Sequence, residues 1–176
     1  MNDQTPASAI DTGQLVHRTA TEAGAGRLSQ FVSFAIGDDQ YGVDIMAVRE
    51  IKGWSQVTYL PAQPDYMRGV LNLRGVMVPI IDLRCRFGQG MTEATSLHIV
   101  IVVQIEGRHV GMLADRVLDI VSIEASQVQP VPRVAQASRV NFLSGLVTIE
   151  TGMIALIDLS PLLSVSTEGA GLGTAA

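Results

Sequence analysis

Few side chains in this sequence could do chemistry as a group. Its three histidines are His17, His98 and His109, and none has a cysteine near it in the sequence. The only acidic partner we consider is Asp115, which follows His109 at a spacing that is unusual for metal ligands. Zinc sites need several such ligands at short, regular spacings. We therefore expect no metal site and, because no phosphate-binding glycine loop follows a strand, no cofactor. Cys85 is the only cysteine, so it forms no disulfide within the chain and is typical of a reducing compartment.

The cysteine and two aspartates are the remaining reactive candidates. Cys85 lies between Arg84 and Arg86, whose charges would lower the pKa of its thiol if the thiol were exposed. No histidine stands beside it as a base, so we interpret it as a packing residue. Asp82 and Asp158 each precede a leucine at the end of an apolar run. Two carboxylates could serve a hydrolase, but we favour a structural role in which each accepts N–H bonds from the turn that follows.

The composition excludes several classes of protein. The 176 residues include 12 Lys and Arg against 17 Asp and Glu, a net charge of −5, and few aromatic residues. A protein that binds nucleic acid needs a positive field and stacking rings. The longest apolar runs, 76–81 and 99–103, are too short to span a membrane, and no secretory signal begins the chain, so we expect a cytoplasmic protein without membrane insertion. Asp115 and Asp119, near a turn, are expected to face water.

Short apolar runs bounded by Gly, Asp and Pro predict a mainly β, all-β class of fold. The run 31–36 ends at the turn 37–40 and resumes at 41–43, which indicates a hairpin. Further strands are expected at 69–73, 76–83, 97–105, 109–113, 143–149 and 153–157. Helical turns are expected only within 44–50 and 161–164. Residues 1–29 and 166–176 lack apolar periodicity and are interpreted as flexible tails around one folded region, 30–165.

An internal repeat relates the two halves of this region. A shift of 69 places 31–36 on 100–105 and Val48 on Val117, while a shift of 76 places 69–73 on 145–149 and 80–83 on 156–159. The seven-residue difference predicts an insertion in the second copy, which we place at 127–141. The repeat therefore predicts two related β units, about 31–90 and 97–164, packed side by side, with ends that could exchange between them.

The two copies differ at one charged position. Arg74 in the first copy falls on Glu150 in the second, and an arginine at a strand-end turn offers a planar donor fork that suits an interface. A simpler alternative is that Arg74 pairs with Glu50 on a neighbouring strand, and both roles can coexist. The apolar residues Val48, Val117 and Ile120 could line a seam between the units or belong to the core.

Several of these segments together resemble the CheW family of bacterial chemotaxis coupling proteins. They are Asp-Gln-Tyr-Gly-Val-Asp-Ile at 39–45, Val-Arg-Glu-Ile at 48–51, Arg-Gly-Val-Leu-Asn-Leu-Arg-Gly at 68–75 and Val-Pro-Ile-Ile-Asp-Leu-Arg at 78–84, with further likeness at 110–111, 115–117 and 129–132. The likeness covers about 31–164. It implies two intertwined five-stranded barrels of the Src-homology-3-like type, with one or two short helical turns.

The resemblance also implies a role without catalysis. Such proteins join the cytoplasmic tip of methyl-accepting chemoreceptors to the histidine kinase CheA, whose regulatory domain is homologous, in membrane-associated arrays that are often polar. It implies a monomer when free and a kinase-facing loop around Val134. The groove between the barrels would receive the receptor hairpin, as helix-in-groove binding does. The family motif places in that groove Val48, Glu50, Asn72, Arg74, Gly75, Val117 and Ile120.

Three alternatives remain open at this stage. The chain could be a CheW-like module of a larger protein such as CheV or CheA, although it starts at Met1 and has no receiver or ATP-binding segment. It could be a small hydrolase that uses Asp82 and Asp158. It could also be a related coupling protein of another pathway, such as surface motility, biofilm formation or second-messenger control, which would use the same residues.

Overall fold

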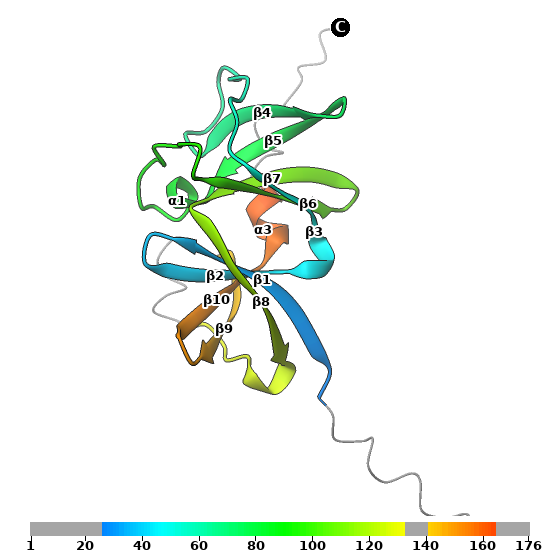
Figure 1. The fold of residues 1–176 in the computed structure, drawn as a ribbon, viewed down its shortest axis with the longest axis vertical. Helices are drawn as coiled ribbons and strands as arrows, with labels where there is room; N and C mark the ends of the chain where they lie inside the picture. Colours follow the sequence, from blue (N-terminus) through cyan, green and yellow to red (C-terminus); the bar gives the residue numbers. More distant parts are fainter. Residues whose placement is uncertain (1–25, 133–140, 165–176) are drawn as a thin grey trace, which may run out of the picture.

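The chain folds into two five-stranded β-sheets that lie one above the other (Figure 1). The computed structural model describes residues 26–132 and 141–164, so most of the expected tails and Val134 lie outside the described residues. The elements in chain order are β1 (Leu28–Ile36), β2 (Asp39–Asp44), the 3₁₀ turn η1 (Ile45–Ala47), β3 (Val48–Gly53), β4 (Met67–Leu73), β5 (Val76–Asp82), α1 (Leu83–Arg86), β6 (Ile99–Ile105), β7 (Arg108–Ala114), β8 (Arg116–Glu124), the 3₁₀ turn η2 (Ala125–Gln127), β9 (Leu143–Ile149), β10 (Gly152–Ile157) and α3 (Leu159–Ser164). The predicted mainly β class is confirmed.

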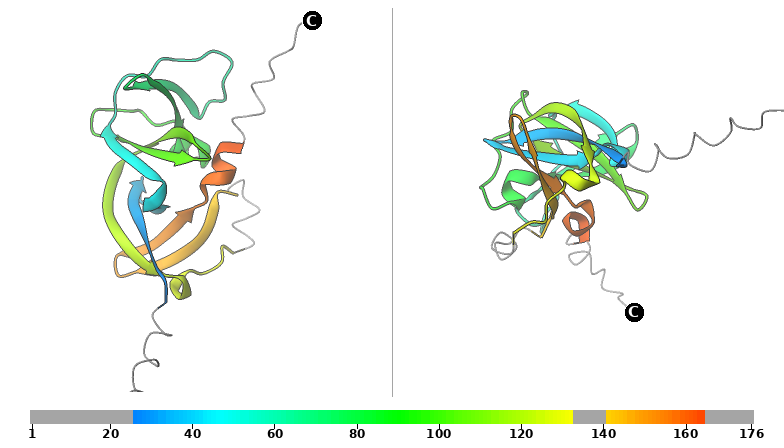
Figure 2. Two further views of the ribbon diagram at one scale, coloured as in Figure 1. Left: turned by 90° about the vertical axis from the view of Figure 1, so that its right-hand side faces the viewer. Right: turned by 90° about the horizontal axis from the view of Figure 1, so that it is seen from below.

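Strand order divides the chain differently from the sequence repeat. One sheet, in the order β3-β6-β7-β5-β4, uses the middle of the chain, and we call it the central barrel. The other, β8-β1-β2-β10-β9, joins the first hairpin to the last three strands, and we call it the terminal barrel. Figure 2 shows the two barrels from the side and from below. The repeats 31–90 and 97–164 each contribute strands to both barrels, so the barrels are intertwined.

The strand pairing repeats with the sequence. Gly42 of β2 lies opposite Leu156 of β10 in a parallel pair, and Gly111 of β7 lies opposite Ile80 of β5 in another. The shifts of 69 and 76 convert the first pair into the second, because 42 + 69 is 111 and 80 + 76 is 156. Each half of the sequence therefore completes a barrel with strands of the other half, through an equivalent parallel strand pair. This equivalence confirms the internal duplication.

The seven extra residues of the second copy lie in two places. Val57 approaches Gly69 as Val128 approaches Gly145, which is a shift of 71 (128 − 57). Two of the extra residues therefore precede Val128 (71 − 69), and five follow it (76 − 71). The insertion predicted at 127–141 holds five of the seven.

Two strands, two short helical segments and the start of β1 differ from the prediction, since α1 and η2 lie outside the stretches 44–50 and 161–164 in which helical turns were expected. β3 and β8 were not expected, and β3 overlaps the stretch 44–50, of which only η1 is helical. Only one face of each strand is covered, but the covered face is not uniformly apolar: in β3 it includes Glu50 and Lys52, whereas in β8 it includes Val117, Val121 and Ile123. β1 begins at Leu28, inside the expected tail 1–29, because Leu28 pairs with Glu124 of β8. Helix α3 covers the other stretch in which a helical turn was expected.

Three clusters of buried apolar side chains hold this arrangement together. One fills the central barrel and includes Leu71, Val78, Ile80, Val100, Val102 and Leu113. A second fills the terminal barrel with Ile123, Val147, Ile154 and Leu156. The largest draws on both barrels and includes Phe34, Tyr41, Ile81, Met112, Phe142 and Leu162. The barrels therefore share a core and do not pack as independent units.

A cation lies between two rings where the barrels meet. The guanidinium carbon of Arg86 is 4.3 Å from the ring centroid of Tyr66, which precedes β4, and 4.4 Å from that of Phe142, which precedes β9. A shift of 76 relates the two rings to each other. The same shift relates Arg86 to Leu162, so this contact occurs once. Contacts of this kind stabilise by about 0.5–2 kcal/mol, and here they join the two halves.

The two glycines at the parallel pairs provide a test of the packing. A Cβ on Gly111 would collide with Ile80 and lie 2.8 Å from Val100, whereas one on Gly42 would lie 3.0 Å from Leu156 and 3.1 Å from Ile154. We expect Gly111→Ala to lower the free energy of unfolding by about 1–3 kcal/mol and Gly42→Ala to lower it by less. Urea unfolding followed by circular dichroism measures both. A larger loss in Gly42→Ala would contradict the packing.

Candidate functional site

Two strands at equivalent positions carry most of the predicted site. In β3, Val48 lies opposite Val103 and Glu50 opposite Val102, so Arg49 is the extra residue of a β-bulge. In β8, Val117 and Asp119 lie opposite consecutive residues of β1, so Leu118 is the extra residue of a second bulge. The shift of 69 relates the two bulges. Bulges redirect side chains next to binding sites, and both edge strands here are bent at the same point.

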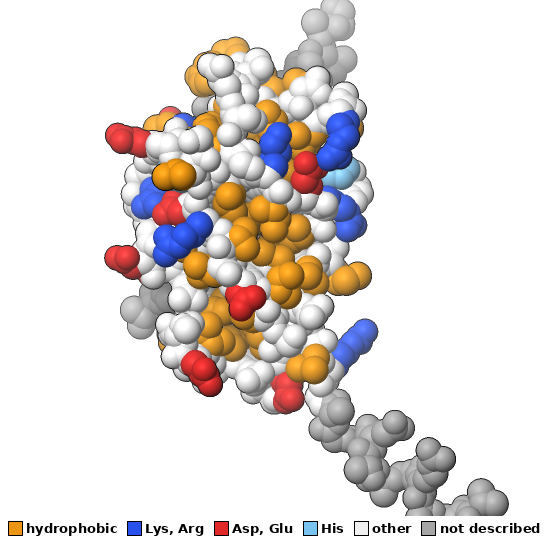
Figure 3. All heavy atoms as spheres, in the orientation of Figure 1, with side chains coloured by type: hydrophobic (Ala, Val, Ile, Leu, Met, Phe, Trp, Pro, Cys, Tyr) orange, Lys and Arg blue, Asp and Glu red, His pale blue; other side chains and the backbone are white. Residues whose placement is uncertain are grey.

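The apolar residues of the site divide into a buried and an exposed group. Val48 and Val117 are partly buried and pack against the core that the barrels share. Ile120 is 53% exposed, and Ile51 and Leu118 are also exposed. Apolar side chains gather in the middle of the face shown in Figure 3, where β8 passes from one barrel to the other in Figure 1. Val48 and Val117 therefore pack with the core, as one of the two interpretations had it, whereas Ile120 faces solvent.

The charged residues of the site meet at the turn between β4 and β5. Arg74 has φ 52° and Gly75 φ 86°, as in the left-handed two-residue turns of hairpins. The side chain of Asn72 accepts the N–H of Gly75 at 2.8 Å and so fixes the turn. The guanidinium of Arg74 donates to Glu50 at 2.6 Å, so the pairing considered from the sequence is confirmed.

This ion pair contributes little to stability. The side chain of Arg74 is 76% exposed and that of Glu50 is 32% exposed. Exposed pairs contribute no more than about 1 kcal/mol. The main effect of the pair between Arg74 and Glu50 is therefore to orient the guanidinium at the tip of the turn, where most of it stays open to a partner.

The structure joins the predicted residues in two groups. Glu50, Asn72, Arg74 and Gly75 form the charged group, and Val48 and Val117 share one apolar cluster. Ile120 belongs neither to the hydrogen-bonded charged group nor to the apolar cluster. It lies on the same face because it is part of β8. We call the face formed by β3, β8 and the β4–β5 turn the seam face. Sequence reasoning did not name Ile51 and Leu118, which a pattern of exposed apolar residues on strands could have found.

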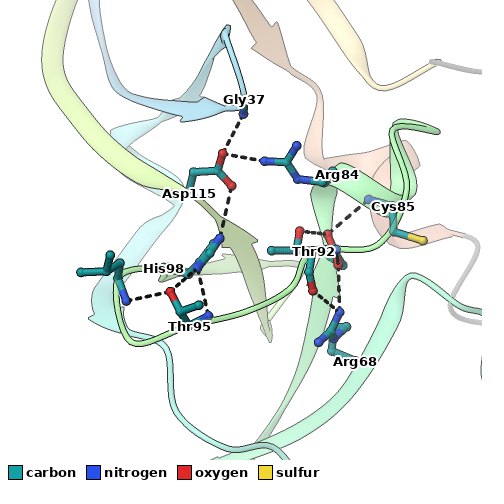
Figure 4. A network of polar contacts seen from close by, with 10 residues as sticks. Gly37, Arg68, Arg84, Cys85, Thr92, Thr95, His98 and Asp115 are labelled. Atoms are coloured by element: carbon teal, nitrogen blue, oxygen red, sulfur yellow. Dashed lines mark hydrogen bonds and ion pairs between the residues drawn. The ribbon is translucent and has the colours of Figure 1, made fainter.

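Asp82 has a structural role, as predicted. It is fully buried and accepts the N–H of Cys85 at 3.2 Å, the N–H of Thr92 at 2.8 Å and the hydroxyl of Thr92 at 2.7 Å. Arg68 also donates to it at 3.2 Å (Figure 4). Asp158 accepts the N–H of Ser160 at 3.0 Å. Each carboxylate therefore binds the turn that follows its strand.

Asp115 is only 18% exposed and is paired with other residues, in contrast to the prediction that it faces water. Its Oδ2 accepts the N–H of Gly37 at 2.7 Å and a guanidinium N–H of Arg84 at 2.6 Å, and Oδ1 lies 3.7 Å from Nε2 of His98 (Figure 4). Its histidine neighbour is thus His98 and not His109. Burial acts to raise the pKa of Asp115, but the Gly37 N–H, Arg84 and His98 outweigh it and hold the pKa below the usual value.

Cys85 fits the packing role expected for it, and the pKa of its thiol is not lowered by the flanking arginines. Burial, followed by the charges of Asp82 and Asp65, raises the pKa of its thiol, and only Arg68 opposes this. The flanking arginines point elsewhere, since Arg84 binds Asp115 and Arg86 lies between two rings. A thiol with a raised pKa is a poor nucleophile, which agrees with a packing role.

Two hollows lie at equivalent edges of the barrels. One, of about 450 Å³ between β2 and β10, is lined by Asp38, Asp39, Tyr41, Leu143 and Met153 among others, and we call it the acidic groove. The other, of about 380 Å³ between β5 and β7, is lined by Met77, Arg108 and His109 among others, and we call it the basic groove. The shift of 76 relates the two methionines, and the shift of 69 relates Asp39 to Arg108. Burial and then Asp39 raise the pKa of Tyr41 to about 12, so its hydroxyl remains neutral.

The described part of the chain contains no group of three or more His, Cys, Asp and Glu residues that could hold a metal ion. Within the same residues, no helix is long and apolar enough to cross a membrane.

A duplicated double barrel that presents an apolar seam and an oriented arginine is the construction of a binding scaffold. Residues 30–166 match the model of the CheW-like domain, and the chain belongs to this family. It is 42% identical over 135 residues to a probable chemotaxis protein CheW of Rhizobium etli, which covers 77% of this chain and 87% of that protein. It is also 42% identical over 135 residues to chemotaxis protein CheW of Klebsiella aerogenes, covering 77% and 81%.

A solved structure shares the fold. The scaffolding protein CheW of Thermoanaerobacter tengcongensis matches with a TM-score of 0.69 at 29% sequence identity, over 80% of this chain and 91% of that one. This chain is therefore a non-catalytic coupling scaffold of chemotaxis, as the motifs predicted. The hydrolase interpretation is wrong, and these relatives do not favour a pathway other than chemotaxis.

The buried aspartate can be compared with its counterpart. Asp82→Asn removes the charge that pairs with Arg68 in a fully buried position, so we expect a loss of about 3 kcal/mol in the free energy of unfolding. Asp158→Asn leaves one exposed turn contact weakened and should cost less than about 1 kcal/mol. Urea unfolding followed by the fluorescence of Trp54 and by circular dichroism measures the two. Equal losses would mean that Asp82 does not organise its turn.

Proposed function

We propose that this scaffold binds the cytoplasmic tip of a chemoreceptor on the seam face and the regulatory domain of the histidine kinase CheA on a second surface. The observation that carries the receptor assignment is Arg74, which Glu50 holds at the tip of a left-handed turn beside an apolar seam. A helical hairpin needs an apolar groove and a few charges that set its register. Through the receptor, the chain would be held at membrane-associated arrays while it remains a monomer when free.

The roles of the seam-face residues follow from their burial. Val48 and Val117 form the floor of the groove, and Ile120 supplies apolar area that a receptor helix can cover. Asn72 and Gly75 set the shape of the turn, and Arg74 offers donors that Glu50 leaves unused. Contact residues of this kind contribute affinity when the partner excludes water from them.

Reversal of the charge at Arg74 tests the receptor face. We expect Arg74→Glu to reduce receptor capture at least tenfold, because it places two carboxylates together and removes the donor fork, and to leave kinase capture unchanged. Pull-downs with a receptor cytoplasmic fragment and with the kinase regulatory domain measure the two separately. Full retention of receptor binding would refute the assignment, and loss of both together with a lower melting temperature would indicate a structural role.

A charge-swapped pair separates these outcomes further. Glu50→Arg combined with Arg74→Glu restores an ion pair at the same place but reverses its direction. We expect this variant to regain stability and not receptor binding. Glu150→Arg, at the equivalent position of the second copy, is the matched control and should leave receptor capture unchanged.

We place the kinase on the acidic groove of the terminal barrel. Val134, the kinase-facing residue that the family resemblance implies, lies outside the described residues, and it precedes Leu143 of the groove lining by nine positions in the sequence (143 − 134). Met153 lies in the same lining and is 54% exposed, so it can serve as an apolar anchor surrounded by Asp38 and Asp39.

The equivalent methionines provide a matched comparison for this surface. Met153→Glu should reduce capture of the kinase regulatory domain at least tenfold, because it adds a charge to the centre of the contact. Met77→Glu makes the same change in the basic groove at nearly the same exposure, 55%, and should have a smaller effect. Titration calorimetry with the kinase domain measures both. A larger loss in Met77→Glu would move the kinase to the basic groove.

A further inference from the structure

The chain passes between the two barrels only twice within the described residues. Strands β1 and β2 belong to the terminal barrel, β3 to β7 to the central barrel, and β8 to β10 to the terminal barrel again. The first crossing is η1, between β2 and β3, and the second is the single residue Asp115, between β7 and β8. Together with the shared core, these crossings determine how one barrel is placed against the other.

The second crossing is bound to both barrels through Asp115. Its backbone N–H donates to Ala35 of β1 at 3.1 Å, and its Oδ2 accepts the N–H of Gly37 at 2.7 Å, both in the terminal barrel. The same oxygen accepts from Arg84 of α1 at 2.6 Å, and Oδ1 faces His98, which precedes β6. Arg84 and His98 belong to the central barrel. One carboxylate thus spans the junction (Figure 4).

At the first crossing Ile45 packs against the shared core, but among the described residues no side-chain hydrogen bond or ion pair of η1 joins the two barrels. The shift of 69 relates Met46 to Asp115, and Met46 is 76% exposed. Its N–H bonds to Asp44, two residues before it, at 2.8 Å, and its carbonyl accepts from Arg49, three residues after it, at 3.2 Å. These bonds are local to the turn, so they cannot relate one barrel to the other.

We propose that Asp115 is a positioning residue whose carboxylate sets the place of β8 against the central barrel and, through it, the spacing of β8 and β3 on the seam face. β8 begins at the next residue, and Val117, one residue later, packs against the shared core, as Val48 of β3 does. A shift of the crossing therefore changes the groove floor directly. The consequence for the receptor rests on the proposed function, whereas the placement of the barrels does not.

The placement can be measured without any partner. Nitroxide labels at Met77→Cys and Met153→Cys, in a Cys85→Ser background, report the distance between the two barrels. We expect a narrow distance distribution in the otherwise unchanged chain and a broadened one after Asp115→Ala. Asp44→Ala, which removes the cap of the first crossing, is the matched control and should leave the distribution narrow. An unchanged width in Asp115→Ala, in a chain that still folds, would overturn the proposal.

A pH profile separates the charge of Asp115 from simple packing. Its pKa is lower in the folded chain, so its contribution to stability is present above the usual aspartate value of about 4 and is lost as the pH falls through the lowered value. The groups that face it are Arg84, His98 and the Gly37 N–H. The stability difference between the wild type and Asp115→Asn should be present above about pH 4 and shrink as the pH falls below that value. A difference that stays constant would contradict the charge-based role.

Receptor binding provides the functional readout. We expect Asp115→Asn, which keeps the size of the side chain, to weaken receptor-fragment binding about tenfold although Asp115 lies outside the proposed contact. Asp44→Ala should bind as the wild type does. If the wild type itself binds no receptor fragment, the proposed function fails, and the label distances and the pH profile still decide the role of Asp115. Normal receptor binding by Asp115→Asn would overturn the link to the seam face.

Discussion

The parallel pairing of β2 with β10 and of β5 with β7 is the constraint on which the rest of the structure depends. Parallel neighbours cannot be joined by a tight turn, so each pair brings together strands that are distant along the chain. Each barrel is complete only when the other half of the duplicated sequence contributes a hairpin. The barrels consequently share their largest core, and a seam between them is unavoidable.

Duplication provides two copies of every surface, and a few substitutions give the copies different properties. Arg74 stands where the second copy has Glu150, so only one hairpin turn presents a guanidinium. Asp39 and Arg108 occupy equivalent places, so one groove is acidic and the other basic. Asp115 corresponds to Met46, so only one crossing carries a charge that reaches both barrels. The binding sites proposed for this scaffold lie where its internal symmetry is broken.

The polar groups that might suggest catalysis are used to hold turns and junctions. Asp82 binds Thr92 and Arg68 inside one barrel, and Asp115 binds Gly37 and Arg84 between the barrels. A carboxylate that accepts from several donors in this way is costly to move, which suits a rigid scaffold.

Local pattern in the sequence was sufficient for most strands, the duplication, the family and the turn role of Asp82, since these depend on residues close together or on a direct repeat. It did not reveal β3 and β8, because strands covered on one face carry a mixed pattern that only their partners explain. Nor did it reveal that His98 and Arg84 meet Asp115, because these residues come from different elements. The family resemblance implied intertwined barrels, but which hairpins are exchanged was decided by the tertiary structure, since a repeat specifies which strands are alike and only long-range pairing specifies which strands meet.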